Sequence, residues 1–500
     1  MESLQGIIFG FSIALKPINL LYCFFGVLIG TLVGVLPGLG PSAAISLLVP
    51  MTLHGSPESG FIMLAGIYYG AMYGGSTTSI LVNMPGEAAS VVTCIDGYQM
   101  ARQGKAGPAL GIAAMGSFIA GTFSIIGLMI AAPPLARFAL QFGPPEYFSL
   151  MVLGLSVLSY LSGGSLLKSL VVAMVGILLG CVGVDTVSGM SRMTFGIPQL
   201  LDGLGIVPVV MGLFGISEVL LNVEMSLKRD VFLHKVKNLL PNVQDWKDSI
   251  GAIFRGSFLG FVLGVLPGGG TIVASFAAYA IEKKVSKHPE KFGRGAIAGV
   301  AGPESANNAA TGGAFIPLLT LGIPANAVMA ILLGALMIHG LQTGPLLMKE
   351  APNIFWGTIA SMYVGNGLLL ILNLPLIPLW VKVLRTPYVL LFPLIILFCF
   401  IGAYSLNNSV VDLLVMLIFG LVGYLFKKFR YEAAPLILAF ILGPLLENSF
   451  RQSLIISNGS FWIFFSKPIS LLLIIIAFLL LISPLVFKGR PTEKLENGED

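Results

Sequence analysis

Charged side chains are scarce in this sequence. Only 10% of its 500 residues are Asp, Glu, Lys or Arg, against roughly 25% in an ordinary soluble domain. The formal net charge is +5, and the basic residues lie in short clusters between apolar stretches. A nucleic-acid-binding protein would instead carry a basic face or stripe. We therefore expect neither a soluble globular protein nor a nucleic-acid partner.

Cysteine and histidine are also rare, with four of each. The cysteines are widely separated and form no CxxC motif, so the sequence predicts neither a disulfide framework nor a structural zinc site. The histidines form no HExxH motif, no GxSxG motif is present, and the glycine-rich LPGGGT lacks the Lys-Ser/Thr of a phosphate-binding loop. These absences argue against an enzyme, and we expect no organic cofactor.

Long apolar stretches are abundant. Apolar residues make up 56% of the chain and form runs such as 109–133, 354–381 and 468–487, which are long enough to cross a hydrocarbon layer of about 30 Å. Only helices and closed barrels satisfy their backbone groups in lipid, and the alternating segments of a barrel are missing. The sequence predicts an all-α integral membrane protein with about 11–13 membrane segments in a lipid bilayer.

The chain contains an internal repeat. Residues 26–40 (GVLIGTLVGVLPGLG) match residues 256–270 (GSFLGFVLGVLPGGG) at eight of fifteen positions. Two looser matches follow in the same order: 73–88 with 312–327, and 97–108 with 334–345. Glycines four residues apart allow close helix packing, and the following Leu-Pro-Gly interrupts a helix. We expect a re-entrant hairpin or a broken helix in each repeat.

Charge in equivalent loops predicts that the repeats are inverted. The loop 51–60 contains no Lys or Arg, whereas its counterpart 282–295 contains five; 97–108 contains two, whereas 334–345 contains none. Basic loops stay in the cytoplasm. This rule places 282–295, the basic stretch 223–255 and the C-terminus inside, and 51–60 and 334–345 outside.

The same analysis divides the chain into four parts. We expect a first membrane repeat over 18–222, a cytoplasmic linker with an interfacial helix over 223–255, a second, inverted repeat over 256–490, and a disordered cytoplasmic tail over 491–500.

Two acidic residues stand alone in long uncharged stretches. Glu87 is the only charged residue between Glu58 and Asp96, and Glu304 the only one between Arg294 and Lys349. A carboxylate at membrane depth is costly unless it is protonated, paired or cavity-lining, so both are candidate functional residues. The alternative is that each caps the start of a helix.

Oxygen-bearing side chains and glycines gather at the same breaks. Inverted repeats with broken helices are typical of secondary transporters, which bind substrate and coupling ions where the repeats meet. The candidate substrate-binding residues are Pro37, Gly38, Gly40, Ser42, Ser76, Thr77, Thr78, Asn83, Gly268, Gly270, Thr271, Asn307, Asn308 and Pro324. The candidate coupling-ion residues, which would form a Na⁺ site, are Glu87, Glu304, Ser79, Ser305 and Asn326. Any one Ser or Thr has the alternative of bonding to its own helix backbone.

Four long motifs carry a family resemblance. Residues 34–50, 68–110, 264–286 and 293–336 closely resemble the TctA family, the large membrane subunit of bacterial tripartite tricarboxylate transporters, and the resemblance spans residues 18–440. It implies a permease in the bacterial inner membrane that imports a tricarboxylate such as citrate, or a related di- or monocarboxylate, by symport with a cation, usually Na⁺. It also implies two partners: a small membrane subunit (TctB-like) and a periplasmic solute-binding protein (TctC-like). A passive anion channel and a membrane scaffold are the alternatives.

Overall fold

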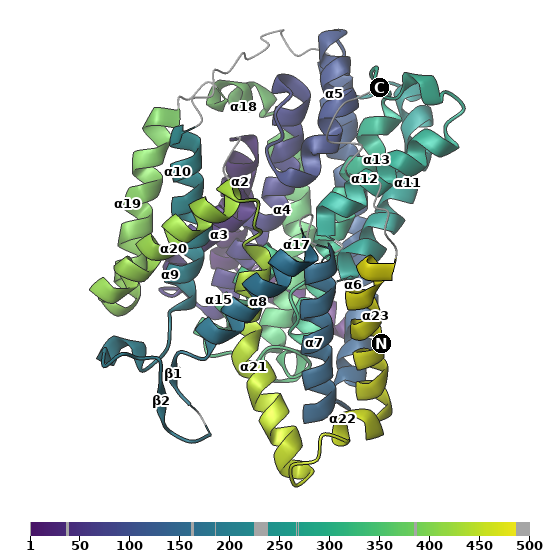
Figure 1. Ribbon diagram of the computed structural model, residues 1–500. Coiled ribbons are helices and arrows are strands. Elements are labelled where there is room, and N and C mark those ends of the chain that lie inside the picture. Colours follow the sequence, from purple (N-terminus) through teal and green to yellow (C-terminus); the bar gives the residue numbers. More distant parts are fainter. Residues whose placement is uncertain are drawn as a thin grey trace.

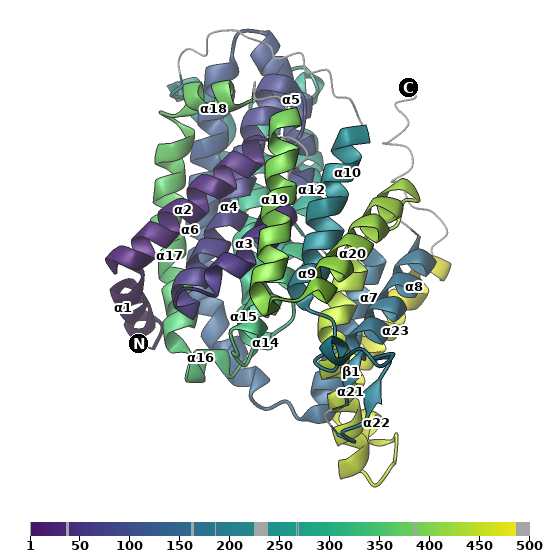
Figure 2. The same cartoon turned by 90° about the vertical axis from the view of Figure 1, so that its left-hand side faces the viewer.

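A computed structural model describes residues 2–36, 40–161, 165–185, 187–224, 239–266, 268, 270–384 and 388–486. Within these ranges the chain is a bundle of helices with one short β-hairpin (Figures 1 and 2). In the described part of the chain, six helices are long and apolar enough to cross a membrane, and six shorter apolar helices have 10–17 residues. The all-α prediction is confirmed, while the expected total of about 11–13 membrane segments stays a prediction.

The first half of the chain forms α1 (Glu2–Ala14), α2 (Pro17–Val35), α3 (Pro41–Thr52), α4 (Pro57–Val82), η1 (Ala88–Ser90), α5 (Val91–Arg102), α6 (Ala106–Ala139), α7 (Pro144–Leu161), α8 (Leu166–Gly180), β1 (Gly183–Val184), β2 (Ser191–Arg192), η2 (Pro198–Leu200), α9 (Ile206–Val210), η3 (Met211–Ile216) and α10 (Ser217–Glu224). The second half forms α11 (Val243–Val265), α12 (Gly270–Val285), η4 (Pro289–Lys291), α13 (Ala298–Gly313), α14 (Phe315–Leu321), α15 (Ala327–Ile338), α16 (Leu347–Glu350), α17 (Pro352–Asn373), α18 (Ile377–Val383), α19 (Tyr388–Asn407), α20 (Val410–Lys428), α21 (Ala434–Ile456), α22 (Ile463–Ser466) and α23 (Pro468–Val486).

The glycine stripes of the two matching segments pack in the same way. Each stripe lies against the backbone of a later helix, α2 against α4 and α11 against α13. A Cβ added to any of these glycines would come within 2.2–2.5 Å of a backbone oxygen, so only glycine permits the approach. The glycine–carbonyl pairs are Gly26–Met63, Gly30–Ile67 and Gly34–Ala71 in the first half, and Gly256–Gly302, Gly260–Ala306 and Gly264–Ala310 in the second.

The breaks after α4 and α14 also correspond. Asn83 and Gly322 end these helices in the left-handed conformation, with φ of 56° and 69°. A proline follows each of them, and Glu87 and Asn326 then cap the next helix by accepting a backbone N–H. Each half therefore has a helix break at this position. The helices are also interrupted at the Leu-Pro-Gly segments. Helix α2 ends at Val35 and α3 begins at Pro41, and α11 ends at Val265 and α12 begins at Gly270.

Loops expected on the same side of the membrane contact one another. The hydroxyl of Thr52 lies 3.3 Å from Nε2 of His339, which joins the loops expected outside. Nε2 of Gln103 donates to the carbonyl of Arg294 over 2.7 Å, which joins the loops expected inside. Figure 1 shows α5 and α18 at one end of the bundle and the β-hairpin and α22 at the other.

One expected boundary falls inside a helix. Helix α11 runs without interruption from Val243 to Val265, across the boundary expected at 255/256. A capping box at Asn242 starts this helix. Helix α8 ends at Gly180, and the β-hairpin begins at Gly183. The remainder of the linker, 225–238, and the tail 491–500 lie outside the described residues.

Ion pairs attach the β-hairpin to α21. Asp185 pairs with Arg192 over 2.6 Å and with Arg451 over 2.8 Å, and Glu447 accepts from both arginines. A hydrogen bond from Ser188, together with these pairs, holds the pKa of Asp185 well below its usual range. The hairpin is therefore fastened by charges that persist throughout the physiological pH range.

Candidate functional site

Glu304 brings helices from both halves of the chain together. It lies in α13 and its side chain is fully buried. One carboxylate oxygen accepts a hydrogen bond of 2.5 Å from Ser76 of α4, and the other accepts one from Thr93 of α5. Helices α4 and α5 belong to the first half and α13 to the second, so this carboxylate lies where the halves meet.

Glu87 lies at the same junction. It is 7% exposed, and Nδ2 of Asn307 donates to its Oε1 over 3.1 Å. Asn307 follows Glu304 by three residues in α13, so the two side chains project from the same helix face. The other oxygen of Glu87 accepts the backbone N–H of Ala89 and caps η1. The helix-cap role weighed for Glu87 is therefore present, and its other carboxylate oxygen faces the second half of the chain.

The two acids lack a basic partner. Throughout the described ranges, no Lys, Arg or His nitrogen pairs with either carboxylate. Two further oxygens of α13, Oγ of Ser305 and Oδ1 of Asn307, are buried without a hydrogen-bond partner in that part of the chain. Uncompensated buried charge is expensive, so such a pair has to take up protons or bind a cation. Carboxylate, amide and hydroxyl oxygens suit a hard cation such as Na⁺.

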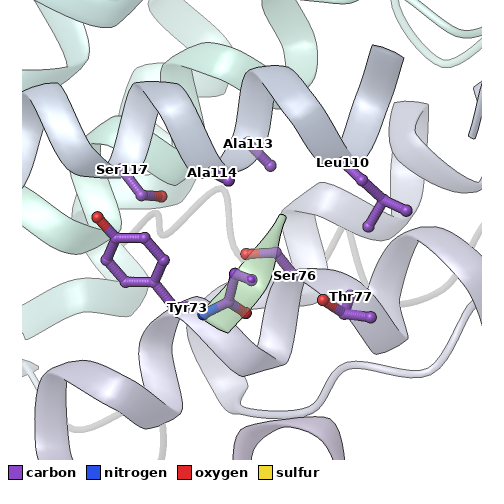
Figure 3. Close-up of a pocket in the computed structure, with 8 residues that line it drawn as sticks. Tyr73, Ser76, Thr77, Leu110, Ala113, Ala114 and Ser117 are labelled. Carbon is purple, nitrogen blue, oxygen red and sulfur yellow. The ribbon is translucent and has the colours of Figure 1, made fainter. Parts of the chain in front are cut away.

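A small polar cavity adjoins this acidic site (Figure 3). Its volume is about 10 Å³, which is room for a single water molecule or bare ion. Figure 3 shows Tyr73, Ser76 and Thr77 of α4 on one side of the cavity and Leu110, Ala113, Ala114 and Ser117 of α6 on the other, with Tyr73 nearest to Ser117. Nδ2 of Asn308 donates to Ser117 over 2.7 Å and to the carbonyl of Glu304. This conformation accommodates one water molecule or bare ion beside Ser76, whose hydroxyl donates to Glu304, but leaves no room in the cavity for a citrate-sized anion.

The structure gathers only part of the predicted set. The predicted residues in or beside the acidic site and the cavity are Ser76, Thr77, Glu87, Glu304, Ser305, Asn307 and Asn308. Thr78 instead donates to the carbonyl of Val35 over 2.8 Å, and Ser79 donates to that of Gly75. The backbone-bonding alternative therefore holds for Ser79, while Thr78 fastens α4 to α2.

Two predicted amides cap helices. Oδ1 of Asn326 accepts the N–H of Met329, and its Nδ2 donates to Tyr68. Asn83 ends α4 and is exposed. Both amides therefore have structural partners or positions that explain them without an ion or a substrate.

Two glycines that follow the Leu-Pro-Gly segments, Gly40 and Gly270, lie beside open space. A Cβ added at Gly40, the N-cap of α3, or at Gly270, the first residue of α12, would meet nothing within 4 Å. Gly268 donates its N–H to the carbonyl of Ala325, the residue that follows the buried Pro324. Ser42 and Thr271 lie in the first turns of α3 and α12. Pro37 and Gly38 lie outside the described residues.

Sequence reasoning missed several residues of the site. Thr93, Tyr73, Ser117 and Asn373 carry neutral polar groups inside apolar helices, and no local pattern distinguishes them. Asp96 was visible as an acid at the end of the uncharged stretch around Glu87. It is fully buried and accepts the N–H groups of residues 293, 295 and 296 over 2.7–2.9 Å, so it joins α5 to the segment preceding α13.

Comparison with known proteins places the chain in a family. Residues 20–438 match the Tripartite tricarboxylate transporter TctA family. The chain is 52% identical over 470 residues, 94% of each chain, to an Agrobacterium vitis protein described as "Uncharacterized 52.8 kDa protein in TAR-I ttuC' 3'region". It is also 55% identical over 211 residues, 42% of this chain and 87% of the relative, to an A. vitis "Uncharacterized protein in TAR-II ttuC' 3'region". No solved structure matches the chain. With nearly the whole helical bundle matched, the chain belongs to the TctA family of the tripartite tricarboxylate transporters.

Proposed function

We propose that this chain is the permease subunit of a secondary active transporter that imports carboxylates by symport with Na⁺. The observation that carries the proposal is the pair of buried acids, Glu87 and Glu304, which lie between the two halves and have no basic partner among the described residues. The substrate is a tricarboxylate such as citrate or a related di- or monocarboxylate, in keeping with the family. The protein lies in the bacterial inner membrane with its C-terminus in the cytoplasm.

The electrical work of import explains why a coupling cation is needed. Moving one elementary charge across 100 mV requires about 2.3 kcal/mol, so a trivalent anion entering an inside-negative cell costs about 7 kcal/mol. Co-transported cations cancel this term, and several of them are needed for a trivalent substrate. A site with two carboxylates provides the negative charge to hold such cations.

The geometry supports an order of binding. A carboxylate in direct contact with an anionic substrate would repel it, whereas a cation bound at Glu304 would attract the substrate. The cavity of about 10 Å³ has room for the cation, which binds first, but not for the substrate, which binds second. The substrate carboxylates then bind at the N-terminal ends of α3 and α12, where Gly40 and Gly270 leave space and backbone N–H groups point outward.

The two halves are inverted repeats in this proposal. The equivalent glycine stripes and left-handed helix ends support the duplication, and the basic loops on one side support the inversion. Each Leu-Pro-Gly segment is a re-entrant turn near the membrane midplane. A periplasmic solute-binding protein of the TctC type delivers the substrate, and a small TctB-like membrane subunit completes the assembly.

The test is uptake into proteoliposomes that contain the chain together with its candidate partner subunits. A panel of labelled carboxylates is offered under imposed Na⁺ or H⁺ gradients. Glu304→Gln and Glu87→Gln are expected to remain inserted and to raise the Na⁺ concentration for half-maximal uptake at least about tenfold, because each removes a charged ligand. Glu350→Gln, at an exposed carboxylate, is the matched control and leaves the Na⁺ dependence unchanged.

Each alternative gives a different result. If both variants transport with the wild-type Na⁺ dependence, the acids are structural and the ion site lies elsewhere. A passive channel would equilibrate the substrate without accumulating it under any gradient. A scaffold subunit would move no substrate at all.

A further inference from the structure

A groove opens on the outer face of the second half, between α11 and α12. Its volume is about 440 Å³, and its walls are formed largely by apolar side chains, among them Phe254, Phe258, Leu259 and Ile281. Phe254 and Phe258 are 56% and 64% exposed, as expected for side chains that face lipid. Both helices lie on the outside of the bundle (Figure 1).

One ion pair lies in this apolar groove. Nε and Nη2 of Arg255 donate to the two carboxylate oxygens of Glu282 over 2.8 and 2.6 Å. Glu282 is 3% exposed, whereas the Arg255 side chain is 46% exposed. A guanidinium has five N–H donors, and the pair uses two of them. Nη1 has no partner in the described part of the chain and remains available to an acceptor outside the protein.

The proposed midplane position of the break after α11 puts the groove at the depth of lipid headgroups. Arg255 precedes the end of α11 by ten residues, or about 15 Å of helix. If the break after α11 is near the membrane midplane, this is half of a hydrocarbon layer of about 30 Å. Lys283 and Lys284 are exposed in the last turn of α12, directly after Glu282. Since the charges of Arg255 and Glu282 cancel, Lys283 and Lys284 give the headgroup end of the groove a net positive charge.

From this combination we propose that the groove is a binding site for an anionic phospholipid of the cytoplasmic leaflet. The phosphate accepts hydrogen bonds from Nη1 of Arg255 and is attracted by Lys283 and Lys284, while an acyl chain lies along Phe258 and Leu259. The charges favour a phospholipid over a second membrane helix, because a free guanidinium donor and two flanking lysines match a phosphate and not an apolar helix surface.

The site is placed to influence α13. Cγ of Glu282 lies 2.8 Å from the position that a Cβ on Gly302 would occupy. Gly256 packs against the carbonyl group of Gly302. Gly302 precedes Glu304 by two residues. A lipid that holds Arg255 and Glu282 in place therefore stabilises the packing of the α11–α12 pair against α13. The lipid site itself does not depend on the proposed transport function.

The experiment measures lipid retention by the purified, delipidated full chain. Phosphatidylglycerol or phosphatidylcholine is added, and native mass spectrometry counts the bound lipids while a thermal-shift assay records stabilisation. Two variants address the two parts of the site. Arg255→Gln with Glu282→Gln removes the charges but keeps a buried polar pair, and Ile281→Trp fills the groove at a position that is already 38% exposed. Lys382→Gln, at an exposed basic residue of α18, is the control.

The wild type is expected to retain one phosphatidylglycerol molecule at least about tenfold more tightly than phosphatidylcholine, since charge-assisted hydrogen bonds to phosphate distinguish the two. Both groove variants should lose this preference and the associated thermal shift, and Lys382→Gln should keep them. Equal retention of the two lipids by the wild type would overturn the proposal, as would unchanged preference in both groove variants. If the wild type is a dimer and either groove variant is a monomer, the occupant of the groove is a second copy of the chain, and the lipid proposal is overturned.

Discussion

The close approach of α11 to α13 offers a sharp test of how the acidic site is held. In Gly260→Ala the new Cβ would lie 2.2 Å from the carbonyl oxygen of Ala306, and ordinary contact begins at 3.4 Å. The helices would have to separate by about 1 Å at this level, since the obstacle is backbone and not a movable side chain. Overpacking of this kind costs about 1–3 kcal/mol.

The displacement should also reach the ion site. Ala306 follows Glu304 by two residues in α13, and Glu304 accepts its hydrogen bond from Ser76 over 2.5 Å. A shift of about 1 Å in α13 is enough to break that bond. We therefore expect Gly260→Ala to lower the melting temperature in detergent and to weaken Na⁺-dependent uptake together. Gly30→Ala, in which the Cβ meets the Ile67 carbonyl at 2.5 Å, should lower the melting temperature in the same way.

The matched control is Gly367→Ala in α17. A Cβ at this position would meet nothing within 4 Å, so the substitution changes only helix propensity. Its melting temperature should equal or exceed that of the wild type. If Gly260→Ala melts like Gly367→Ala, the two helices are not in the close contact described, and the reasoning from the glycine stripe is refuted.

Two other predictions concern the junction of the halves and their orientation. Asp96→Ala should destabilise the chain strongly, because the backbone N–H groups of residues 293, 295 and 296 lose the buried carboxylate that accepts them, and hydrogen bonds to a charged group contribute about 1.5–3 kcal/mol each. Asp96→Asn should recover part of that loss, and equal melting temperatures for the two variants and the wild type would contradict this. In a cysteine-free background, an impermeant thiol reagent applied from outside should label Ser56→Cys and not Lys287→Cys, and labelling of both positions would contradict the inverted orientation.

Local features of the amino-acid sequence were enough to identify the class of protein and the places where its helices break. Apolar runs long enough to cross a membrane require helices whatever the remaining sequence is, because backbone groups in lipid have to bond internally. Glycines four residues apart and a following Leu-Pro-Gly act through the backbone alone, so their meaning is also local. The two lone acids were recognisable because a charge in an apolar stretch is costly wherever the chain folds.

The partners of these acids depend on tertiary packing. Ser76 and Ser79 are three residues apart and chemically identical, yet the rotation of α4 turns Ser76 toward Glu304 and leaves Ser79 bonded to its own helix. Thr93 contacts Glu304 across more than 200 positions of sequence. A hydroxyl has nearly equal alternatives in its own helix and across an interface. Only the packing of α4, α5 and α13 decides between them, because that packing sets which oxygens lie within hydrogen-bonding distance of the buried carboxylates.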